Sequence, residues 1–123
     1  MRRNQATSQP IILVVKSADG EFVTGVRTVQ AGEIGGPYDV VFLTCKAYDL
    51  DRAIDEFLPA LATTSAVLPV LNGINHVAVL QDRLGAGRVL GGVVIFLFTT
   101  TPGGEIVVPG HGTGQTSFGE LPG

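Results

Sequence analysis

The sequence predicts an α/β protein with a β-α-β-α-β core followed by antiparallel strands. Two continuously apolar runs, residues 39–45 and 66–71, have the length and composition of buried strands. A helical spacing of apolar residues follows each run. From Val89 onward the pattern changes to strands separated by glycine-rich turns. This alternation indicates a parallel sheet with right-handed crossovers that ends in an antiparallel section.

The segment before this core predicts a β-hairpin. Residues 11–16 (IILVVK) form a β-branched run, and Asp19-Gly20 is a strong turn dipeptide. Residues 21–26 alternate polar and apolar side chains, as an edge strand does. Residues 30–37 contain crowded glycines and predict a loop before the first core strand.

The core elements are expected in a fixed order. The run 39–45 should be a strand covered on both faces, as in parallel sheets. The helix that follows should have Asp49 as its N-cap and end near Pro59. After the strand 66–71, a second helix should stop at Gly85. The apolar positions that predict the helices are Leu50, Ala53, Ile54, Phe57, Leu58 and Leu61 in the first and Val77, Val79, Leu80 and Leu84 in the second.

The last third of the chain is expected to be all β. A long run extends from Val89 to Thr101, and Pro102-Gly103-Gly104 predicts a turn. Residues 106–108 and 116–118 then predict two further strands.

The composition excludes several classes of protein. Of 123 residues, 45% are hydrophobic and 15% charged, which is enough apolar surface to bury a core. A net charge of −3 and a pI near 5.2 argue against a nucleic-acid partner, because such proteins normally carry a basic face. The longest apolar stretch, 89–98, is about half the length of a bilayer crossing, so no membrane partner is expected.

The location and disulfide content follow from simple features. The single cysteine, Cys45, cannot form an internal disulfide or a cysteine-rich metal site. Residues 1–5 carry positive charge without the apolar region of a signal peptide. We therefore expect a soluble, cytoplasmic protein.

Two segments are candidates for ligand binding, because ligands of such sheets bind beyond the carboxyl ends of the parallel strands. Lys46 follows the first buried run and precedes a helix, which favours an anion such as phosphate. The alternative is a lysine whose stem covers apolar surface while its ammonium group stays in water. Asn72-Gly73 follows the second run and offers a hydrogen-bonding amide and an accessible backbone. The alternative, which is the commoner use of this dipeptide, is an ordinary turn.

The sequence context of the two histidines and the cysteine favours structural roles for these side chains. His76 and His111 lack neighbours spaced as metal ligands, so no metal site is expected. His76 is interpreted as a polar position on the second helix, and His111 as a loop residue. Cys45 lies in the first buried run and has no obvious base beside it, which favours a buried structural thiol.

The glycine-rich phosphate fingerprint is incomplete. Residues 85–90 and 112–117 each begin with its spacing but lack the third glycine. Neither segment follows a predicted strand and opens a helix, as the fingerprint requires. A complete dinucleotide site is therefore not predicted from these residues.

The order of motifs resembles the ketopantoate reductase (2-dehydropantoate 2-reductase) family. Residues 38–48 (YDVVFLTCKAY) resemble a buried strand that ends in a Lys-Ala-aromatic motif, and residues 68–73 (LPVLNG) resemble the next strand with its Asn-Gly. Residues 88–93 (RVLGGV) are similar to the following strand. Residues 103–108 and 118–121 look like the hairpin that closes the family's first domain. The resemblance covers nearly the whole chain.

The resemblance implies a partial Rossmann-type sheet and an NADP (NADPH) cofactor. The family reduces the small molecule 2-dehydropantoate to pantoate in pantothenate biosynthesis. By resemblance, the cofactor-binding residues are Lys46, beside the nicotinamide end, and Asn72 with Gly73 near the same end. Arg2 or Arg3 would meet the 2′-phosphate.

The resemblance also implies missing parts. The family's first strand with its glycine-rich turn and its C-terminal helical domain have no counterpart, and the catalytic lysine belongs to that domain. Residues 1–123 are therefore expected to form a single, incomplete NADP-binding domain with no catalytic residue and no activity in isolation. One alternative is a non-catalytic truncated module, expected to be a homo-oligomer because a strand edge would be open. Another is a fragment of a different NAD(P)-dependent hydroxy-acid dehydrogenase.

Overall fold

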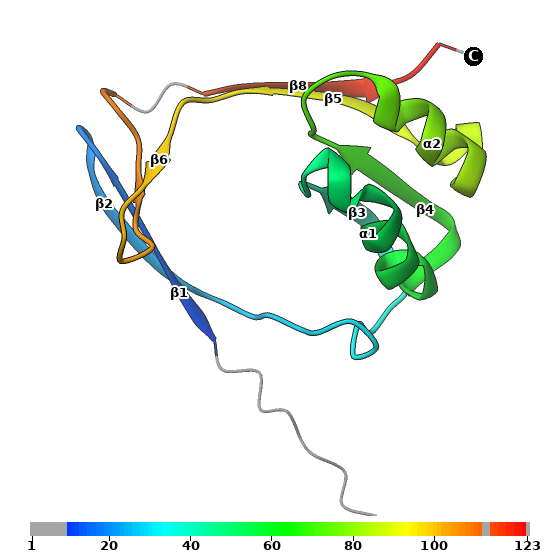
Figure 1. The fold of residues 1–123 in the computed structure, drawn as a ribbon, viewed down its shortest axis with the longest axis horizontal. Coiled ribbons are helices and arrows are strands. Elements are labelled where there is room, and N and C mark those ends of the chain that lie inside the picture. The colour runs from blue at the N-terminus through cyan, green and yellow to red at the C-terminus, as the bar shows by residue number, and fades with distance from the viewer. Residues whose placement is uncertain (1–9, 112–113, 123) are drawn as a thin grey trace, which may run out of the picture. The chain divides into compact units, whose positions relative to one another are not determined.

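The computed structural model describes residues 10–111 and 114–122. They form two compact units (Figure 1). The first unit contains the described residues up to Gln30 together with those from Phe96 to Gly114. The second contains Ala31–Ile95 and the described residues from Gln115 onward. The expectation of one domain over residues 1–123 stays a prediction.

The first unit is a small four-stranded sheet in the order β2-β1-β7-β6. Its strands are β1 (Ile11–Ser17), β2 (Gly20–Val26), β6 (Thr99–Thr100) and β7 (Ile106–Val107). Strands β1 and β2 pair antiparallel, and Gly20 has a φ of 130° at the turn between them. The predicted hairpin is therefore confirmed. Strand β7 runs antiparallel to β6 and parallel to β1, so the segment 106–108 pairs within this unit and not with the segment 118–121.

The second unit contains the predicted β-α-β-α-β core and an antiparallel final strand. Its elements are β3 (Tyr38–Leu43), α1 (Leu50–Phe57), β4 (Leu61–Pro69), α2 (Asn75–Leu84), β5 (Leu90–Ile95) and β8 (Gln115–Glu120). Strands β3 and β4 pair parallel, and β5 pairs antiparallel with β8. A parallel bridge between Val67 and Val89 links the two pairs. This arrangement confirms the predicted fold class.

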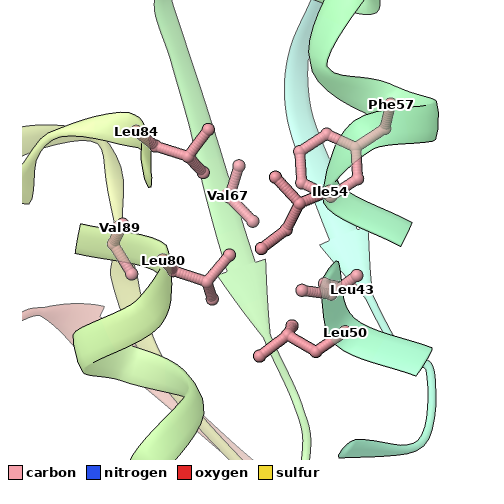
Figure 2. Packing of buried hydrophobic residues seen from close by; sticks show 8 residues of the cluster. All are labelled: Leu43, Leu50, Ile54, Phe57, Val67, Leu80, Leu84 and Val89. Carbon is pink, nitrogen blue, oxygen red and sulfur yellow. The ribbon is translucent and has the colours of Figure 1, made fainter. Parts of the chain in front are cut away.

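One hydrophobic cluster holds the second unit together (Figure 2). Val67 of β4 lies at its centre and packs with Ile54 from α1 and Leu80 from α2; all three are fully buried. The cluster is completed by Leu43, Leu50, Phe57, Leu84 and Val89. Both helices therefore cover the same face of the strands, as right-handed crossovers between parallel strands require.

The other face of β3 is exposed, which corrects one prediction. Leu43 is buried against the helices, whereas Tyr38, Val40 and Phe42 are exposed, Phe42 to 64%. The expectation that residues 39–45 are covered on both faces is therefore wrong, although the parallel pairing is right. A continuous apolar run shows that both faces are hydrophobic but does not show which element covers each face.

The boundary between α1 and β4 also differs from the prediction. Helix α1 ends at Phe57, and Pro59 lies in a 3-10 turn, Leu58–Ala60. Leu61, predicted to be the last helical position, is the first residue of β4. The polar residues 63–65 hid this early start of the strand, because they interrupt the apolar pattern. Asp49 occupies the predicted N-cap position but makes no capping hydrogen bond through its side chain.

Ser65 fixes β4 against β3. Its buried hydroxyl donates to the carbonyl of Tyr38 at 2.5 Å and accepts from the backbone N–H of Ala62 at 2.7 Å. Arg88 donates through Nε to the Ser65 carbonyl at 3.2 Å and through Nη2 to the Ala62 carbonyl. These bonds lie where the β3–β4 register shifts, between Tyr38 and Val40.

Strand β5 approaches β4 closely at Gly92. A Cβ at this position would lie 2.5 Å from the Pro69 carbonyl oxygen and 2.7 Å from Cδ1 of Leu68. The glycine is therefore needed for the close approach of the two strands.

Candidate functional site

The two candidate ligand-binding segments leave the sheet at the same edge. Leu43 and Pro69 are register partners at the ends of β3 and β4, and the N–H of Val70 donates to the Leu43 carbonyl at 3.0 Å. Lys46 lies three residues after Leu43, and Asn72 lies three residues after Pro69. The structure thus brings both segments to the carboxyl edge of the parallel pair, where ligands of α/β sheets bind.

Lys46 is exposed at the start of a short 3-10 helix, Ala47–Asp49, that leads into α1. Its carbonyl accepts a hydrogen bond from the N–H of Asp49 at 2.9 Å, which fixes the turn. Among the described residues, no carboxylate forms an ion pair with its ammonium group. The positive charge is therefore available to an anionic ligand group.

Asn72 and Gly73 form an exposed turn between β4 and α2. Gly73 has a φ of 83°, a conformation that strains any other residue. No atom lies within 4 Å of a Cβ built on it, so the space beside this backbone is open. The Asn72-Gly73 segment is therefore both a turn and a place where a ligand can reach the backbone.

A cavity of about 300 Å³ lies beside these segments. Residues from the start of α1 and the start of α2 form its walls, with the Asn-Gly turn between them. The lining comprises Ala47, Leu50, Asp51, Asn72, Gly73, Ile74, Asn75, His76 and Val79. Its volume is at the lower end of the range for ligand pockets, so it suits one portion of a dinucleotide better than the whole.

His76 is the cavity residue that sequence reasoning did not assign to the site. It lies on α2, as predicted, but its side chain is buried, with 7% of its surface exposed, and lines this cavity. Burial lowers the pKa of its imidazole below the ordinary value. The signal was present, because His76, Leu80 and Leu84 recur at four-residue steps and form the buried face of α2.

Asp51 provides the charge in the cavity wall. Its carboxylate lies in the first turn of α1, and its Oδ1 is 3.6 Å from Nη1 of Arg83 on α2. Arg83 also donates from Nη2 to Oδ1 of Asp55. The arginine therefore offsets part of the negative charge beside the cavity.

The other side chains singled out from the sequence are Cys45, His111, Arg2 and Arg3. Cys45 lies beyond the end of β3 and is half-buried, and burial raises the pKa of its thiol. His111 is exposed in the first unit, with Nδ1 2.6 Å from Oδ1 of Asp19, in the loop where it was predicted. Arg2 and Arg3 lie outside the described residues.

Two kinds of feature are absent from the described part of the chain. Within residues 10–111 and 114–122, no three His, Cys, Asp or Glu side chains gather as a metal site would need. Within the same residues, no helix has the length and apolar character needed to cross a membrane.

Comparison with curated proteins identifies two relatives, one described as an uncharacterized oxidoreductase and the other as a 2-dehydropantoate 2-reductase. An uncharacterized oxidoreductase of Bacillus subtilis (strain 168), YkpB, is 33% identical over 94 residues, which are 76% of this chain and 31% of the relative. A 2-dehydropantoate 2-reductase of Aquifex aeolicus (strain VF5) is 26% identical over 93 residues, 75% of this chain and 28% of the relative. The chain therefore spans less than a third of the length of these relatives.

Solved structures show the same fold. The crystal structure of 2-dehydropantoate 2-reductase from Geobacter metallireducens GS-15 has a TM-score of 0.77 and 27% identity, and the match covers 98% of this chain and 40% of that one. A D-mandelate dehydrogenase with NADH and anilino(oxo)acetate has a TM-score of 0.76 at 19% identity, covering 89% of this chain and 35% of that one. The second likeness concerns the fold alone.

A protein-family model described as "Ketopantoate reductase PanE/ApbA" matches residues 2–123. The mixed α/β fold agrees with the Rossmann-like N-terminal domain of such reductases. The chain therefore belongs to the ketopantoate reductase family of oxidoreductases.

Proposed function

We propose that this chain holds the nicotinamide end of NADPH in an enzyme that reduces 2-dehydropantoate to pantoate. The observation that carries the proposal is the cavity at the carboxyl ends of β3 and β4, with the Asn72-Gly73 turn in its wall and Lys46 next in sequence to Ala47 of that wall. The oxidoreductase class follows from the family. The substrate is proposed from the family and from the description of the Aquifex relative.

The residues at the cavity fit one end of the cofactor. The space beside Gly73 admits a flat group against the backbone, and the Asn72 amide can both donate and accept hydrogen bonds. The described residues contain no glycine-rich turn between a strand and a helix, so the proposal assigns no pyrophosphate site to them. When bound, the reduced nicotinamide supplies a hydride.

Each of the three residues has a distinct role in the proposal. The exposed ammonium group of Lys46 attracts an anionic group of cofactor or substrate to the edge of the sheet. Asn72 hydrogen-bonds the cofactor near the nicotinamide, and Gly73 keeps the approach open. We assign these residues to binding and none to catalysis, so cofactor affinity is the decisive measurement.

The proposal is tested by titrating the chain with NADPH in isothermal calorimetry. We expect Lys46→Ala to weaken binding about tenfold or more, because a hydrogen bond to a charged group contributes about 1.5–3 kcal/mol. Asn72→Ala should weaken it roughly threefold to tenfold, as a neutral hydrogen bond is lost. Arg52→Ala, which removes an exposed cation of α1 outside the cavity lining, and Gln81→Ala, which removes an amide of α2, are the matched controls.

Two further titrations separate the parts of the proposal. NADH in place of NADPH tests the preference for the 2′-phosphate, and equal affinities would remove the NADP assignment while leaving the nicotinamide site. Loss of NADPH absorbance with 2-dehydropantoate, compared with other 2-keto acids, tests the substrate in the enzyme to which the site belongs. Equal affinity of wild type, Lys46→Ala and Asn72→Ala for NADPH would contradict the proposal itself.

The proposal also includes self-association and a cytoplasmic location. In the part of the chain that the structure describes, β3 pairs with β4 on one edge and has no strand on the other. Its exposed side chains Tyr38, Val40 and Phe42 add an apolar face beside that edge, which favours pairing with a second copy. Light scattering at micromolar concentration should show a dimer or larger species, and a monomeric mass would contradict this part.

A further inference from the structure

His76 combines features that a structural histidine does not need. Its side chain is buried but lines the cavity beside the Asn72-Gly73 turn. Within residues 10–111 and 114–122, no side chain or backbone group forms a hydrogen bond with its ring. No side-chain polar atom of the described residues is both fully enclosed and without a partner, so each ring nitrogen of His76 keeps some exposed surface. A polar ring in this position is ready to bond a group placed there.

The cavity wall defines the chemistry of that group. Its polar side chains are the amides of Asn72 and Asn75, the imidazole of His76 and the carboxylate of Asp51, which is partly offset by Arg83. Burial lowers the pKa of His76, so its ring is neutral at pH 7. No cation lines the wall, which disfavours a phosphate or carboxylate inside the cavity. Amides, a neutral imidazole and a carboxylate together match a group that both donates and accepts hydrogen bonds.

We propose that His76 is a further binding residue, which hydrogen-bonds the uncharged ribose and carboxamide portion of the nicotinamide nucleoside inside this cavity. The inference rests on the proposed function and adds a residue and an orientation to it. The cofactor's nucleoside end enters between α1 and α2, while its charged groups stay outside the cavity, because no cation lines its wall. Leu50, Ile74 and Val79 line the remaining wall and provide apolar contact for a ring.

The first test observes the histidine ring directly. The chain has two histidines, and His111 belongs to the other compact unit, so it serves as an internal control. Long-range ¹H–¹⁵N spectra record the ring nitrogens during titration with NADPH, with reduced nicotinamide mononucleotide and with adenosine 2′,5′-bisphosphate. We expect the first two ligands to shift the His76 signals and the third to leave them unchanged, with His111 constant throughout.

The second test measures affinity. We expect His76→Phe to weaken NADPH binding roughly threefold to tenfold, and His76→Gln, which keeps a donor and an acceptor, to stay within about twofold of the wild type. Gln81→Ala on the same helix is the control. Thermal melting of each variant identifies any loss of folding, and the spectra of the wild type remain decisive because they need no substitution.

The outcomes separate this inference from the function on which it rests. If NADPH shifts the backbone signals of Lys46 and Asn72 but not the His76 ring, the proposed function survives and the inference fails. If NADPH shifts none of these signals, both fail. A shift of the His76 ring by the bisphosphate alone would place the adenosine end in the cavity and overturn the inference.

Discussion

Replacing Ser65 with alanine should destabilise the second unit by about 2–3 kcal/mol. The Ser65 hydroxyl is buried and makes two hydrogen bonds, to the Tyr38 carbonyl at 2.5 Å and from the Ala62 N–H at 2.7 Å. An internal hydrogen bond contributes about 0.5–1.5 kcal/mol, and a buried group left without its partner costs about 1–3 kcal/mol. Alanine removes both bonds and fills nearly the same volume, so lost hydrogen bonding dominates the effect.

Urea unfolding followed by circular dichroism measures this change. We expect the midpoint for Ser65→Ala to fall by about 1 M or more with an unchanged slope, which indicates lost stability of one folded state. Thr64→Ala, at an exposed neighbouring position of β4, should change the free energy of unfolding by less than about 0.5 kcal/mol. A loss below about 0.5 kcal/mol in Ser65→Ala would refute the assignment of Ser65 as the group that fixes β4 to β3.

Three other predictions follow from the packing and burial of side chains in the second unit. Gly92→Ala should destabilise it by at least about 1–3 kcal/mol, because the new Cβ would lie 2.5 Å from the Pro69 carbonyl oxygen, measured by urea unfolding. Ile54→Ala should cost about 2–5 kcal/mol, because this side chain is fully buried, again measured in urea. The wild type should lose stability below pH 6.5, and His76→Gln should lose less, measured by unfolding at several pH values.

The sign of the pH effect follows from the pKa of His76. Burial places the folded-state pKa below the ordinary value of 6.5, so the unfolded state binds more protons as the pH falls. Stability is therefore fully present above pH 6.5 and is lost toward the folded-state pKa. Equal pH profiles for wild type and His76→Gln would contradict this.

The packing variants have two matched controls. Val79→Ala, at an exposed position, is the control for Ile54→Ala, and Gly87→Ala, where a Cβ meets no neighbour, is the control for Gly92→Ala. A control that loses as much stability as its packing variant would contradict the packing argument.

The periodic elements of the fold could be predicted from the sequence. The hairpin, both helices and the parallel strands leave clear local signals, because the helices repeat apolar positions at helical spacing, the hairpin contains an Asp-Gly turn and the parallel strands are continuous apolar runs. The start of β4 could not be located, since Thr63, Thr64 and Ser65 interrupt the apolar pattern and the Ser65 hydroxyl is satisfied by a hydrogen bond to a distant residue, Tyr38. The exposed face of β3 was also missed, because the hydrophobicity of a strand does not show whether another element covers each of its faces.

The candidate site was predictable in position but not in composition. Lys46 and Asn72 follow strand ends, and the topology of parallel strands brings such ends to one edge. His76 was interpreted only as a polar helix position, because its chemistry was weighed more than its four-residue spacing from Leu80. The cavity beside it depends on how α1 and α2 pack, which no local pattern encodes.

We propose that the edge shared by β3 and β4 binds the nicotinamide end of NADPH. Backbone ¹H–¹⁵N spectra of the chain during NADPH titration test it most directly. We expect saturable shifts of Lys46, Asn72 and Gly73, which Asn72→Ala weakens and Arg52→Ala leaves intact. Saturable shifts confined to residues outside this edge, or no shifts at all, would contradict it.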